Sequence, residues 1–180
     1  CITGASSGFG EACAIKFSEH HFDVIITGRR KEKLESLKKR SEEKQDVKVY
    51  VLPMDVQNKS AVFEAVESLP AEWKKIDVLL NNAGLALGRE NFDQASLDDW
   101  DTMIDTNVKG LLYMSRAVLP LMISRNQGHI INIGSIAATQ VYQKGNVYCA
   151  TKHAVEAISQ SMRIDLLPHK IKVTAIHPGA

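Results

Sequence analysis

Short apolar runs alternate along this chain with longer segments in which apolar residues recur at helical spacing. The runs predict strands at residues 1–3, 23–27, 47–52, 77–80, 129–133 and 172–176. The longer segments predict helices near residues 9–20, 31–44, 59–68, 97–124 and 147–167. Nearly every position of most runs is apolar, which is typical of strands covered on both faces. The alternation therefore predicts an α/β domain with a parallel sheet and helices on both sides.

The whole chain is expected to form a single domain. Its 180 residues contain no linker-like or low-complexity stretch that would divide them. The first letters, CITG, resemble the end of a strand, and the chain stops at HPGA. We therefore expect one domain over residues 1–180 that is truncated at both ends.

Charge and composition argue against several classes of partner. With 22 basic and 21 acidic residues, the net charge of +1 provides no field that would attract a polyanion. Binding to nucleic acid or to a membrane is therefore not expected, and no apolar run approaches the ~20 residues of a membrane span. Cys1, Cys13 and Cys149 lack metal-ligand spacing, so we expect reduced thiols, a cytoplasmic protein and no metal site. His129 and His177 have no spaced ligand partner and are interpreted as structural.

A glycine-rich turn, TGASSGFG, follows the first predicted strand and precedes a helix. Its glycines would let the backbone approach a pyrophosphate, and the helix N-terminus presents unpaired N–H groups to such an anion. The residues concerned are Gly4, Gly8 and Gly10, with Thr3, Ser6 and Ser7 as possible hydroxyl donors. The spacing differs from G-x-G-x-x-G, and a plain turn between strand and helix would also explain it.

The end of the second predicted strand indicates which dinucleotide would bind. In NAD-selective domains an acidic residue near this position binds the ribose hydroxyls. Here the sequence reads TGRRKEK, with Arg29 and Arg30, and two guanidinium groups can bind a 2′-phosphate through paired hydrogen bonds. Solvated charges are the alternative, although cations at a helix start oppose its dipole. The prediction is NADP.

Polar residues also follow the third and fourth predicted strands. Asp55, in the sequence MDV, could accept a hydrogen bond from an adenine amino group, and Asn82 lies in the sequence NNAG. Open α/β sheets bind their ligands at this carboxyl edge. Capping of the next helix by Asp55 and Asn58, and a turn fixed by Asn82, are equally good explanations.

A possible catalytic set lies in the last third of the chain. Ser135 follows the fifth predicted strand, Tyr148 lies thirteen residues later, and Lys152 is one helical turn beyond Tyr148 on the same helix face. The phenol of an ordinary tyrosine has a pKa of about 10, and a nearby ammonium group favours its ionised form. Such a pair could exchange a proton near neutral pH, as reduction of a carbonyl by hydride transfer requires. Taken singly, Tyr148 is better explained by packing and Lys152 by solvation.

Together these motifs resemble the short-chain dehydrogenase/reductase family. TGASSGFG, NNAG, Ser135 with YCATK, and the closing HPG match that family over essentially the whole chain. The resemblance implies a Rossmann-like, doubly wound parallel sheet of strand order 3-2-1-4-5-6, with a C-terminal strand and a substrate lid that are absent from this chain. It also implies a homotetramer in which the helices at 97–124 and 147–167 pair across subunits. A deeper monomer core would explain the same apolar helices.

The resemblance also implies roles for particular residues. Tyr148 would be the acid/base, and Lys152 would hold the nicotinamide ribose and lower the pKa of the tyrosine. Ser135 would hydrogen-bond the substrate oxygen, and Asn107, in DTNVKG, would organise a proton-relay water. The residues expected to bind the cofactor are Thr3, Gly4, Ser6, Ser7, Gly8, Phe9, Gly10, Arg29, Arg30, Asp55, Val56, Asn82, Ala83, Gly84, Tyr148, Lys152, Pro178 and Gly179.

Within the family, the chain is most similar to the bacterial NADP-dependent 3-hydroxy acid dehydrogenases, which oxidise serine, allo-threonine and 3-hydroxypropionate-type substrates. The segments TGRRKEKL, NNAGLALG, DDWDTMIDTN and GHIINIGS carry much of this similarity. We therefore expect an NADP-dependent oxidoreductase that interconverts a hydroxyl and a carbonyl on a small 3-hydroxy acid. The alternatives are a 3-oxoacyl thioester reductase of the same family and a non-catalytic, dinucleotide-binding regulatory protein.

Overall fold

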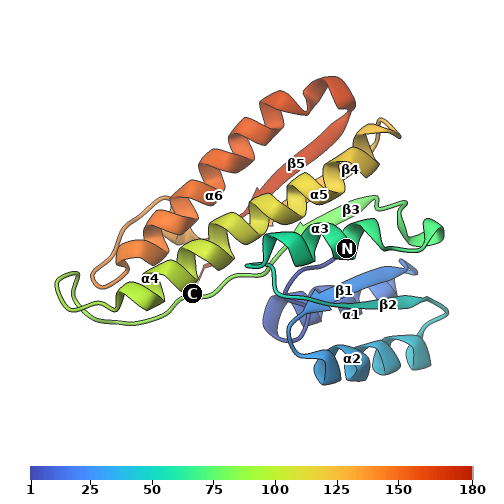
Figure 1. Ribbon diagram of the computed structural model, residues 1–180, viewed down its shortest axis with the longest axis horizontal. Helices are drawn as coiled ribbons and strands as arrows, with labels where there is room; N and C mark the ends of the chain where they lie inside the picture. Colours follow the sequence, from blue (N-terminus) through green and yellow to red (C-terminus); the bar gives the residue numbers. More distant parts are fainter. Residues whose placement is uncertain (180) are drawn as a thin grey trace.

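A parallel sheet forms the centre of the computed structural model, which describes residues 1–179 (Figure 1). Strands β1 (Val24–Gly28) and β2 (Val49–Pro53) pair with each other, as do β3 (Val78–Asn81), β4 (Gly128–Ile133) and β5 (Ile171–Ile176) in that order. Every pairing is parallel. The alternation of apolar runs and helical segments therefore predicted the class of fold correctly.

Ile2 joins the two groups of strands. It forms a parallel bridge with Ile26 of β1 on one side and with Leu80 of β3 on the other. The strand expected at residues 1–3 is therefore shorter than predicted, because only Ile2 takes part in the ladder. The physical reason is Gly4, whose φ of 65° turns the chain out of the sheet directly after Thr3.

Helices connect the strands as expected. They are α1 (Gly8–Glu19), α2 (Lys31–Lys44), α3 (Lys59–Glu67), α4 (Leu97–Ile104), α5 (Leu111–Ile123) and α6 (Asn146–Asp165). Short 3₁₀ turns lie at Ala71–Trp73, Ile136–Ala138 and Leu167–His169. The segment predicted as one helix at 97–124 is continuous, but its winding changes to a π-helical turn at Asp105–Gly110 between α4 and α5.

The sheet separates two apolar cores, because successive residues of each strand point to opposite faces. On β1, Val24 and Ile26 pack with α1 and α2, whereas Ile25 packs on the opposite face with α3 and α5. In α2, whose sequence is almost entirely polar, Leu34 and Leu37 supply the contact and are buried. Both faces of β1 are thus covered, which explains why its sequence has no polar alternation.

A row of buried polar side chains fixes α6 to the sheet. Asn81 of β3 donates to Asn132 of β4 (Nδ2 to Oδ1, 2.9 Å) and to Ser115 of α5 (2.9 Å). Asn132 in turn donates to Ser159 of α6 (Nδ2 to Oγ, 2.9 Å), whose hydroxyl donates to the Val155 carbonyl (2.7 Å). Since an unmade buried hydrogen bond costs about 1–3 kcal/mol, this row sets the register between α6 and the strands.

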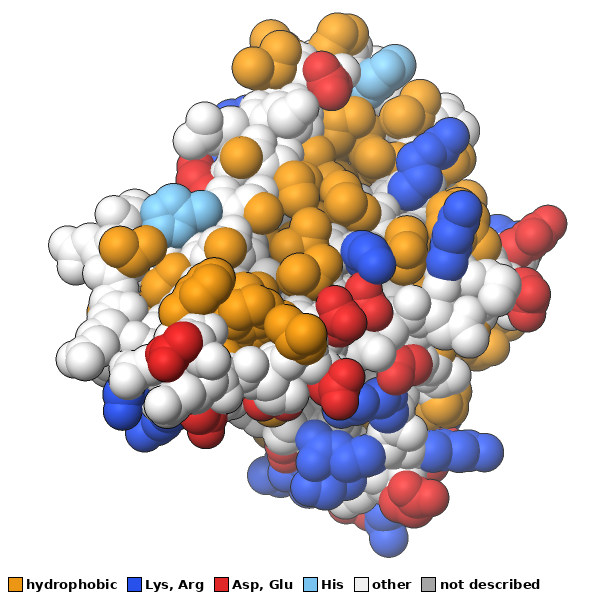
Figure 2. Space-filling model, turned by 60° about the vertical axis from the view of Figure 1, so that its left-hand side comes forward, with side chains coloured by type: hydrophobic (Ala, Val, Ile, Leu, Met, Phe, Trp, Pro, Cys, Tyr) orange, Lys and Arg blue, Asp and Glu red, His pale blue; other side chains and the backbone are white. Residues whose placement is uncertain are grey.

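The surface differs between the two halves of the molecule. Figure 2 shows the largest group of Lys and Arg side chains at the bottom of the view, the level at which α2 lies in Figure 1. Hydrophobic side chains gather at the middle and top of the view, at the levels of α4, α5 and α6. Among the exposed apolar residues, Ile104 belongs to α4, Leu112 and Ile123 to α5, and Ile164 to α6.

Candidate active site

A cavity of about 520 Å³ runs along the carboxyl edge of the sheet. At one end it is lined by the glycine-rich turn and by Arg29 and Arg30, and at the other by Ser135, Tyr148 and Lys152. The further lining residues that the sequence predicted as cofactor-binding are Gly4, Ser6, Ser7, Gly8, Phe9, Asp55, Val56, Asn82, Ala83, Gly84, Pro178 and Gly179. The fold thus brings both predicted groups of residues into a single cavity.

Some predicted site residues lie behind the wall of the cavity. Among residues 1–179, Thr3, Gly10 and Asn107 are predicted site residues that do not line it. Sequence reasoning missed the lining residues Gly28, Met54, Leu85, Ala86, Thr106, Ile133 and Gly134. Each of these stands beside or close to a predicted site residue, so extending the motifs by a few positions would have found them.

The glycine-rich turn adopts the conformation that a closely approaching anion requires. Gly4 (φ 65°) and Gly8 (φ 59°) are left-handed, where other residues are strained. A Cβ at Gly10 would lie 2.4 Å from Asn82 Nδ2 and 2.5 Å from the Gly4 carbonyl oxygen, so only glycine fits there. Gly8 begins α1, and within the described chain Ser7 makes no side-chain capping bond to it. The N–H groups of the first turn of α1 therefore lack a side-chain cap and suit an anionic ligand.

Thr3 and Asn82 hold this turn against the end of β3. The buried Thr3 hydroxyl accepts hydrogen bonds from the backbone N–H groups of Asn82 and Ala83, both at 2.9 Å. The Asn82 side chain returns the contact by donating to the carbonyls of Thr3 (2.9 Å) and Gly4 (3.3 Å). Thr3 therefore shapes the cavity from behind, whereas Asn82 both fixes the turn and lines the cavity.

Arg30 lines the cavity and contacts the glycine-rich turn. Its guanidinium donates to Ser6 Oγ (Nη2, 2.9 Å; Nε, 3.2 Å) and to Ser7 Oγ (Nη2, 2.8 Å). Arg29 lies beside it, with Nη1 3.9 Å from Asp55 Oδ2. A cation and two hydroxyl groups thus lie together, a donor set that matches the oxygens of a phosphate group.

Asp55 and Asn58 differ in their local roles. Asn58 caps α3 by accepting from the Ala61 N–H (3.1 Å), as the capping alternative predicted. Asp55 does not cap that helix in the described residues and instead accepts from the Gln57 N–H (3.0 Å). Its second carboxylate oxygen faces Arg29, on the lining of the cavity.

Asn107 lies in the π-helical turn and links two walls of the site. Its Oδ1 accepts from the Leu85 N–H (2.8 Å), and its Nδ2 donates to the Leu85 carbonyl (2.8 Å) and to Thr151 Oγ1 (3.1 Å) on α6. π-Helical turns occur frequently at functional sites. Here the turn lets one buried amide connect the segment after β3 to the helix that carries Tyr148 and Lys152.

Ser135 follows β4 and begins the 3₁₀ turn Ile136–Ala138. Its backbone is extended (φ −171°), and its Oγ accepts from the Ala137 N–H (3.1 Å). Accepting that bond leaves the hydroxyl hydrogen able to donate to another group. Ser135 therefore presents a hydrogen-bond donor to the cavity.

Tyr148 and Lys152 lie in α6, one turn apart, and both line the cavity. Lys152 Nζ is 5.8 Å from the centroid of the Tyr148 ring, so the ammonium and the phenol are neighbours as predicted. Nζ also donates to the carbonyl of Ile133 (2.9 Å), which anchors the lysine to the end of β4. The pair is thereby fixed to the sheet edge beside Ser135.

Burial lowers the pKa of Lys152 from an ordinary value of 10.5 to about 8, because the charged form loses hydration. The side chain is buried, and the whole residue is only 6 % exposed. At pH 7 the ammonium is still the main form, since the pKa remains about one unit higher. Lys152 can therefore supply both a positive charge and hydrogen-bond donors beside Tyr148 at neutral pH.

Residues 1–179 contain neither a metal-ligand cluster nor a membrane-spanning helix. No cluster of three or more His, Cys, Asp or Glu side chains is arranged to hold a metal ion in this part of the chain. None of the helices formed by these residues is sufficiently long and apolar to span a bilayer. The three cysteines are unpaired thiols within this range.

The parallel sheet, the glycine-rich turn at the start of α1 and the cavity at the carboxyl edge define a Rossmann-like α/β domain, a class that binds ligands at this edge. The family can then be stated from sequence comparison. The chain belongs to the short chain dehydrogenase family, whose model matches residues 1–180.

Curated relatives show the same family at closer range. The chain is 53% identical over 178 residues to the NADP-dependent 3-hydroxy acid dehydrogenase YdfG of Escherichia coli strain K12. The aligned region covers 99% of this chain and 70% of that protein. It is 41% identical over 179 residues to an NADP-dependent 3-hydroxy acid dehydrogenase of Schizosaccharomyces pombe, and the aligned region covers 99% of this chain and 69% of that protein. The resemblance found in the sequence motifs is thus confirmed.

Solved structures agree with these relatives. The crystal structure of serine dehydrogenase from Escherichia coli matches with a TM-score of 0.94 and 52% identity, over 99% of this chain and 81% of that one. A closed form of serine dehydrogenase complexed with NADP⁺ also matches with a TM-score of 0.94 and 52% identity, over 99% and 70%. The fold described above is therefore shared with enzymes of known structure.

The buried lysine gives a pH-dependent prediction. Because the pKa of Lys152 is about 8 in the folded protein and 10.5 is its ordinary value, the unfolded chain binds more protons between these values. Stability must therefore rise with pH in this range relative to a variant without the lysine. From pH 7 to pH 9.5, the free energy of unfolding should rise by about 2 kcal/mol more in the wild type than in Lys152→Met.

Urea unfolding without nucleotide at several pH values measures this difference. Lys33→Met, on the exposed face of α2, controls for the loss of a positive charge. A wild-type to Lys152→Met difference that is constant from pH 7 to pH 9.5 would contradict the assigned effect of burial.

Proposed function

We propose that residues 1–180 form the catalytic domain of an NADP-dependent oxidoreductase that interconverts a hydroxyl and a carbonyl group on a small 3-hydroxy acid. One observation carries the proposal: a single cavity is lined by Ser135, Tyr148 and Lys152 at one end and by Arg30 and the glycine-rich turn at the other. The names of the relatives support the substrate class, since serine is itself a small 3-hydroxy acid.

The residues that would hold NADP fit its chemistry. The first turn of α1, with Gly4 and Gly8, suits the pyrophosphate, and Arg30 with Ser6 and Ser7 suits the 2′-phosphate. We assign Asp55 to the adenine, and Lys152 to the nicotinamide ribose. The other proposed lining contacts are Phe9, Arg29, Val56, Asn82, Ala83, Gly84, Tyr148, Pro178 and Gly179. When bound, NADP supplies or accepts the hydride at the substrate carbon.

The protein then handles the proton and the substrate oxygen. Tyr148 gives a proton to that oxygen during reduction and takes it back during oxidation. Ser135 donates a hydrogen bond to the same oxygen, and Lys152 supplies a positive charge 5.8 Å from the centroid of the Tyr148 ring. Asn107 holds α6 and the segment after β3 together, and its proposed relay water would bind beside Lys152, since both residues adjoin Gly84.

Several wider features of the protein are part of the same proposal. Counting the strand at Ile2 as strand 1, the spatial order β2, β1, Ile2, β3, β4, β5 supports the strand order 3-2-1-4-5-6. A further strand and a substrate lid would be added in the complete domain. The exposed apolar side chains of α4 and α5, including Ile104, Leu112 and Ile123, support packing between subunits in a homotetramer. The free thiols Cys1, Cys13 and Cys149 support a cytoplasmic location.

Replacing Tyr148 tests the chemical step. Tyr148→Phe keeps the ring but removes the hydroxyl that exchanges the proton, so kcat should fall by roughly 10²- to 10⁴-fold. NADPH affinity should change little, because the aromatic ring remains on the cavity wall. Steady-state assays with a 3-hydroxy acid and fluorescence titration of NADPH measure the two quantities.

Tyr50→Phe is the matched control. Tyr50 belongs to β2, packs against Trp73 and does not line the cavity. Near-native turnover in Tyr148→Phe would refute the acid/base assignment. Absence of turnover in the wild type with every hydroxy acid and thioester tried would favour the non-catalytic binding protein instead.

Arg30 gives a separate test of cofactor choice. A hydrogen bond to a charged group contributes about 1.5–3 kcal/mol, so Arg30→Ala should weaken NADPH binding by roughly tenfold to a hundredfold. NADH binding should change by less than about threefold, because NADH has no 2′-phosphate for this guanidinium to contact. The double variant with Arg29→Ala should lose the preference for NADPH almost completely.

Fluorescence titration of each nucleotide measures these affinities. Arg116→Ala, on the exposed surface of α5, is the control for a lost arginine. Equal affinities of the wild type for NADPH and NADH would overturn the assignment.

The substrate class is tested by a panel assayed with NADP on the full-length protein. Free 3-hydroxy acids, including serine and 3-hydroxypropionate, should exceed 3-oxoacyl and 3-hydroxyacyl thioesters in kcat/KM by at least about tenfold, a difference of ~1.4 kcal/mol in transition-state binding. The opposite order would replace the proposal by a 3-oxoacyl thioester reductase, which needs the same proton chemistry.

A further inference from the structure

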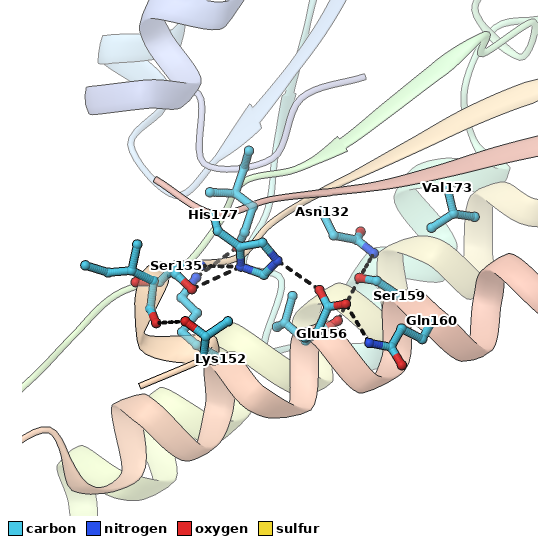
Figure 3. Close-up of polar contacts among 12 residues, drawn as sticks. Asn132, Ser135, Lys152, Glu156, Ser159, Gln160, Val173 and His177 are labelled. Atoms are coloured by element: carbon cyan, nitrogen blue, oxygen red, sulfur yellow. Dashed lines mark hydrogen bonds and ion pairs between the residues drawn. The ribbon is translucent and has the colours of Figure 1, made fainter. Parts of the chain in front are cut away.

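His177 lies between β5 and the cavity residues Pro178 and Gly179, and it contacts the site from behind. No sequence motif pairs this histidine with another residue. In the structure its imidazole lies between Ser135 and Glu156, which come from different elements (Figure 3). The contacts of both ring nitrogens indicate what this histidine does.

One ring nitrogen contacts the backbone of Ser135 and the other contacts a carboxylate. Nδ1 is 3.0 Å from the Ser135 carbonyl oxygen and 3.3 Å from the Ser135 nitrogen, and Nε2 is 2.9 Å from Glu156 Oε2. A carboxylate can only accept, so the ring donates to Glu156 through Nε2–H. Nδ1 then accepts from the Ser135 N–H in the neutral ring or donates to the Ser135 carbonyl in the charged ring. Either form holds the backbone of Ser135.

Glu156 is well placed to fix this ring. A hydrogen bond from Gln160, and then one from His177, lower the pKa of Glu156 below its ordinary value. Gln160 Nε2 donates to Glu156 Oε1 (2.8 Å), which leaves Oε2 for the histidine. Glu156 and His177 are both only about a quarter exposed. The carboxylate is therefore ionised, oriented and partly shielded from water.

Close packing prevents the ring from moving toward the strand end. A Cβ at Gly134 would lie only 2.5 Å from His177 Nδ1, so the imidazole lies directly against this glycine. The backbones beside it are joined as well, since the Gly134 N–H donates to the Ile176 carbonyl (2.7 Å) and the Ile136 N–H to the Pro178 carbonyl (3.2 Å). The residues before and after Ser135 are thus both hydrogen-bonded to the segment that contains His177.

The same helix face carries the anchor and the proposed acid/base pair. Tyr148, Lys152 and Glu156 follow one another at intervals of four residues in α6, so they share one face. A hydrogen-bonded path therefore runs from α6 through Glu156 and His177 to Ser135. It fixes the distance between the helix that carries Tyr148 and the turn that carries Ser135.

We propose that His177, anchored by Glu156, is a positioning residue that sets Ser135 relative to Tyr148 so that both hydroxyls converge on the substrate oxygen. The inference rests on the proposed function, because it needs Ser135 to contact the reacting group. His129, in β4, is a contrasting case, because its contact only links two strands. His129 Nε2 lies 2.8 Å from Thr174 Oγ1 and links β4 to β5 away from the cavity lining.

A double-mutant cycle between His177 and Ser135 tests the proposal. His177→Ala should lower kcat by roughly tenfold to a hundredfold, the loss expected when a contact to the reacting group is misplaced by up to about 1 Å. Affinity for NADPH should change by less than about threefold. In the Ser135→Ala background, adding His177→Ala should lower kcat by less than about threefold, because residues that act as a unit are not additive.

Variants of the anchor refine the test. Glu156→Gln keeps an acceptor for Nε2–H and should retain most of the wild-type kcat, whereas Glu156→Ala should reproduce the His177→Ala loss and its coupling to Ser135. If His177→Ala cannot be recovered folded, Glu156→Ala carries the same cycle. His129→Ala is the control: thermal unfolding should show reduced stability, while kcat stays near the wild-type value.

The outcomes separate this inference from the proposed function. If Ser135→Ala leaves kcat unchanged, the role of Ser135 in the proposed function fails. If Ser135→Ala lowers kcat but the His177 and Ser135 effects multiply in the double variant, the positioning role of His177 is refuted and the proposed function stands. A loss in His177→Ala that is matched by His129→Ala would likewise assign His177 to stability alone.

Discussion

The contact between Thr3 and the end of β3 is the constraint on which the cavity depends. Ile2 pairs with β1 on one side and with β3 on the other, so the connections leave this point toward opposite edges of the sheet. Parallel sheets open a crevice where this happens. The Thr3 hydroxyl binds the N–H groups of Asn82 and Ala83 there, and the glycine-rich turn begins one residue later. A single buried hydroxyl thus keeps the turn and the end of β3 at a fixed separation.

The position of α6 is the second constraint, and it is imposed by several polar contacts along the helix. Thr151 accepts from Asn107, Lys152 donates to the Ile133 carbonyl, Glu156 accepts from His177, and Ser159 accepts from Asn132. Each contact joins α6 to another element, and together they cover more than two turns. Burying the Lys152 ammonium among them costs stability, as its lowered pKa shows. Proteins accept such a cost where function needs the charge.

The elements could be predicted because their causes are local. Apolar runs such as DVIIT and HIINI predicted strands, and the helix expected at 31–44 is found at Lys31–Lys44. The burial of Leu34 and Leu37 became visible only in the structure. The first strand was predicted too long because the turn at Gly4 ends it early. The π-helical winding around Asn107 was missed, since nothing in DTNVKG distinguishes it from α-helix before the contacts to Leu85 and Thr151 are known.

The two ends of the cavity also differed in how much of their structure could be predicted from the sequence. At one end, the lining residues come from short continuous motifs, so the sequence predicted that Ser6, Ser7 and Arg30 belong to the site, and all three line the cavity. At the other end, Ser135 and Tyr148 were predicted and line the cavity, but the contacts that hold them were not predicted. His177 and Glu156 are 21 positions apart, and no periodicity connects a residue after β5 with one in α6. Long-range contacts of this kind arise from tertiary packing alone.

Because one end of the cavity is built from local motifs and the other from long-range contacts, substitutions should affect the two ends differently. Under the proposed function, side chains from one turn and one neighbouring strand end would bind the phosphate, so a few local substitutions would alter cofactor preference while the fold stays intact. The proposed chemistry requires hydroxyls on two elements to meet at one oxygen, within the small tolerance that proton transfer allows. Under the proposed function, this geometry would depend on the contacts between α6 and the sheet edge, including that of His177, which lies outside the cavity. Sequence motifs identify the groups that react, whereas the network behind them determines how well they are aligned.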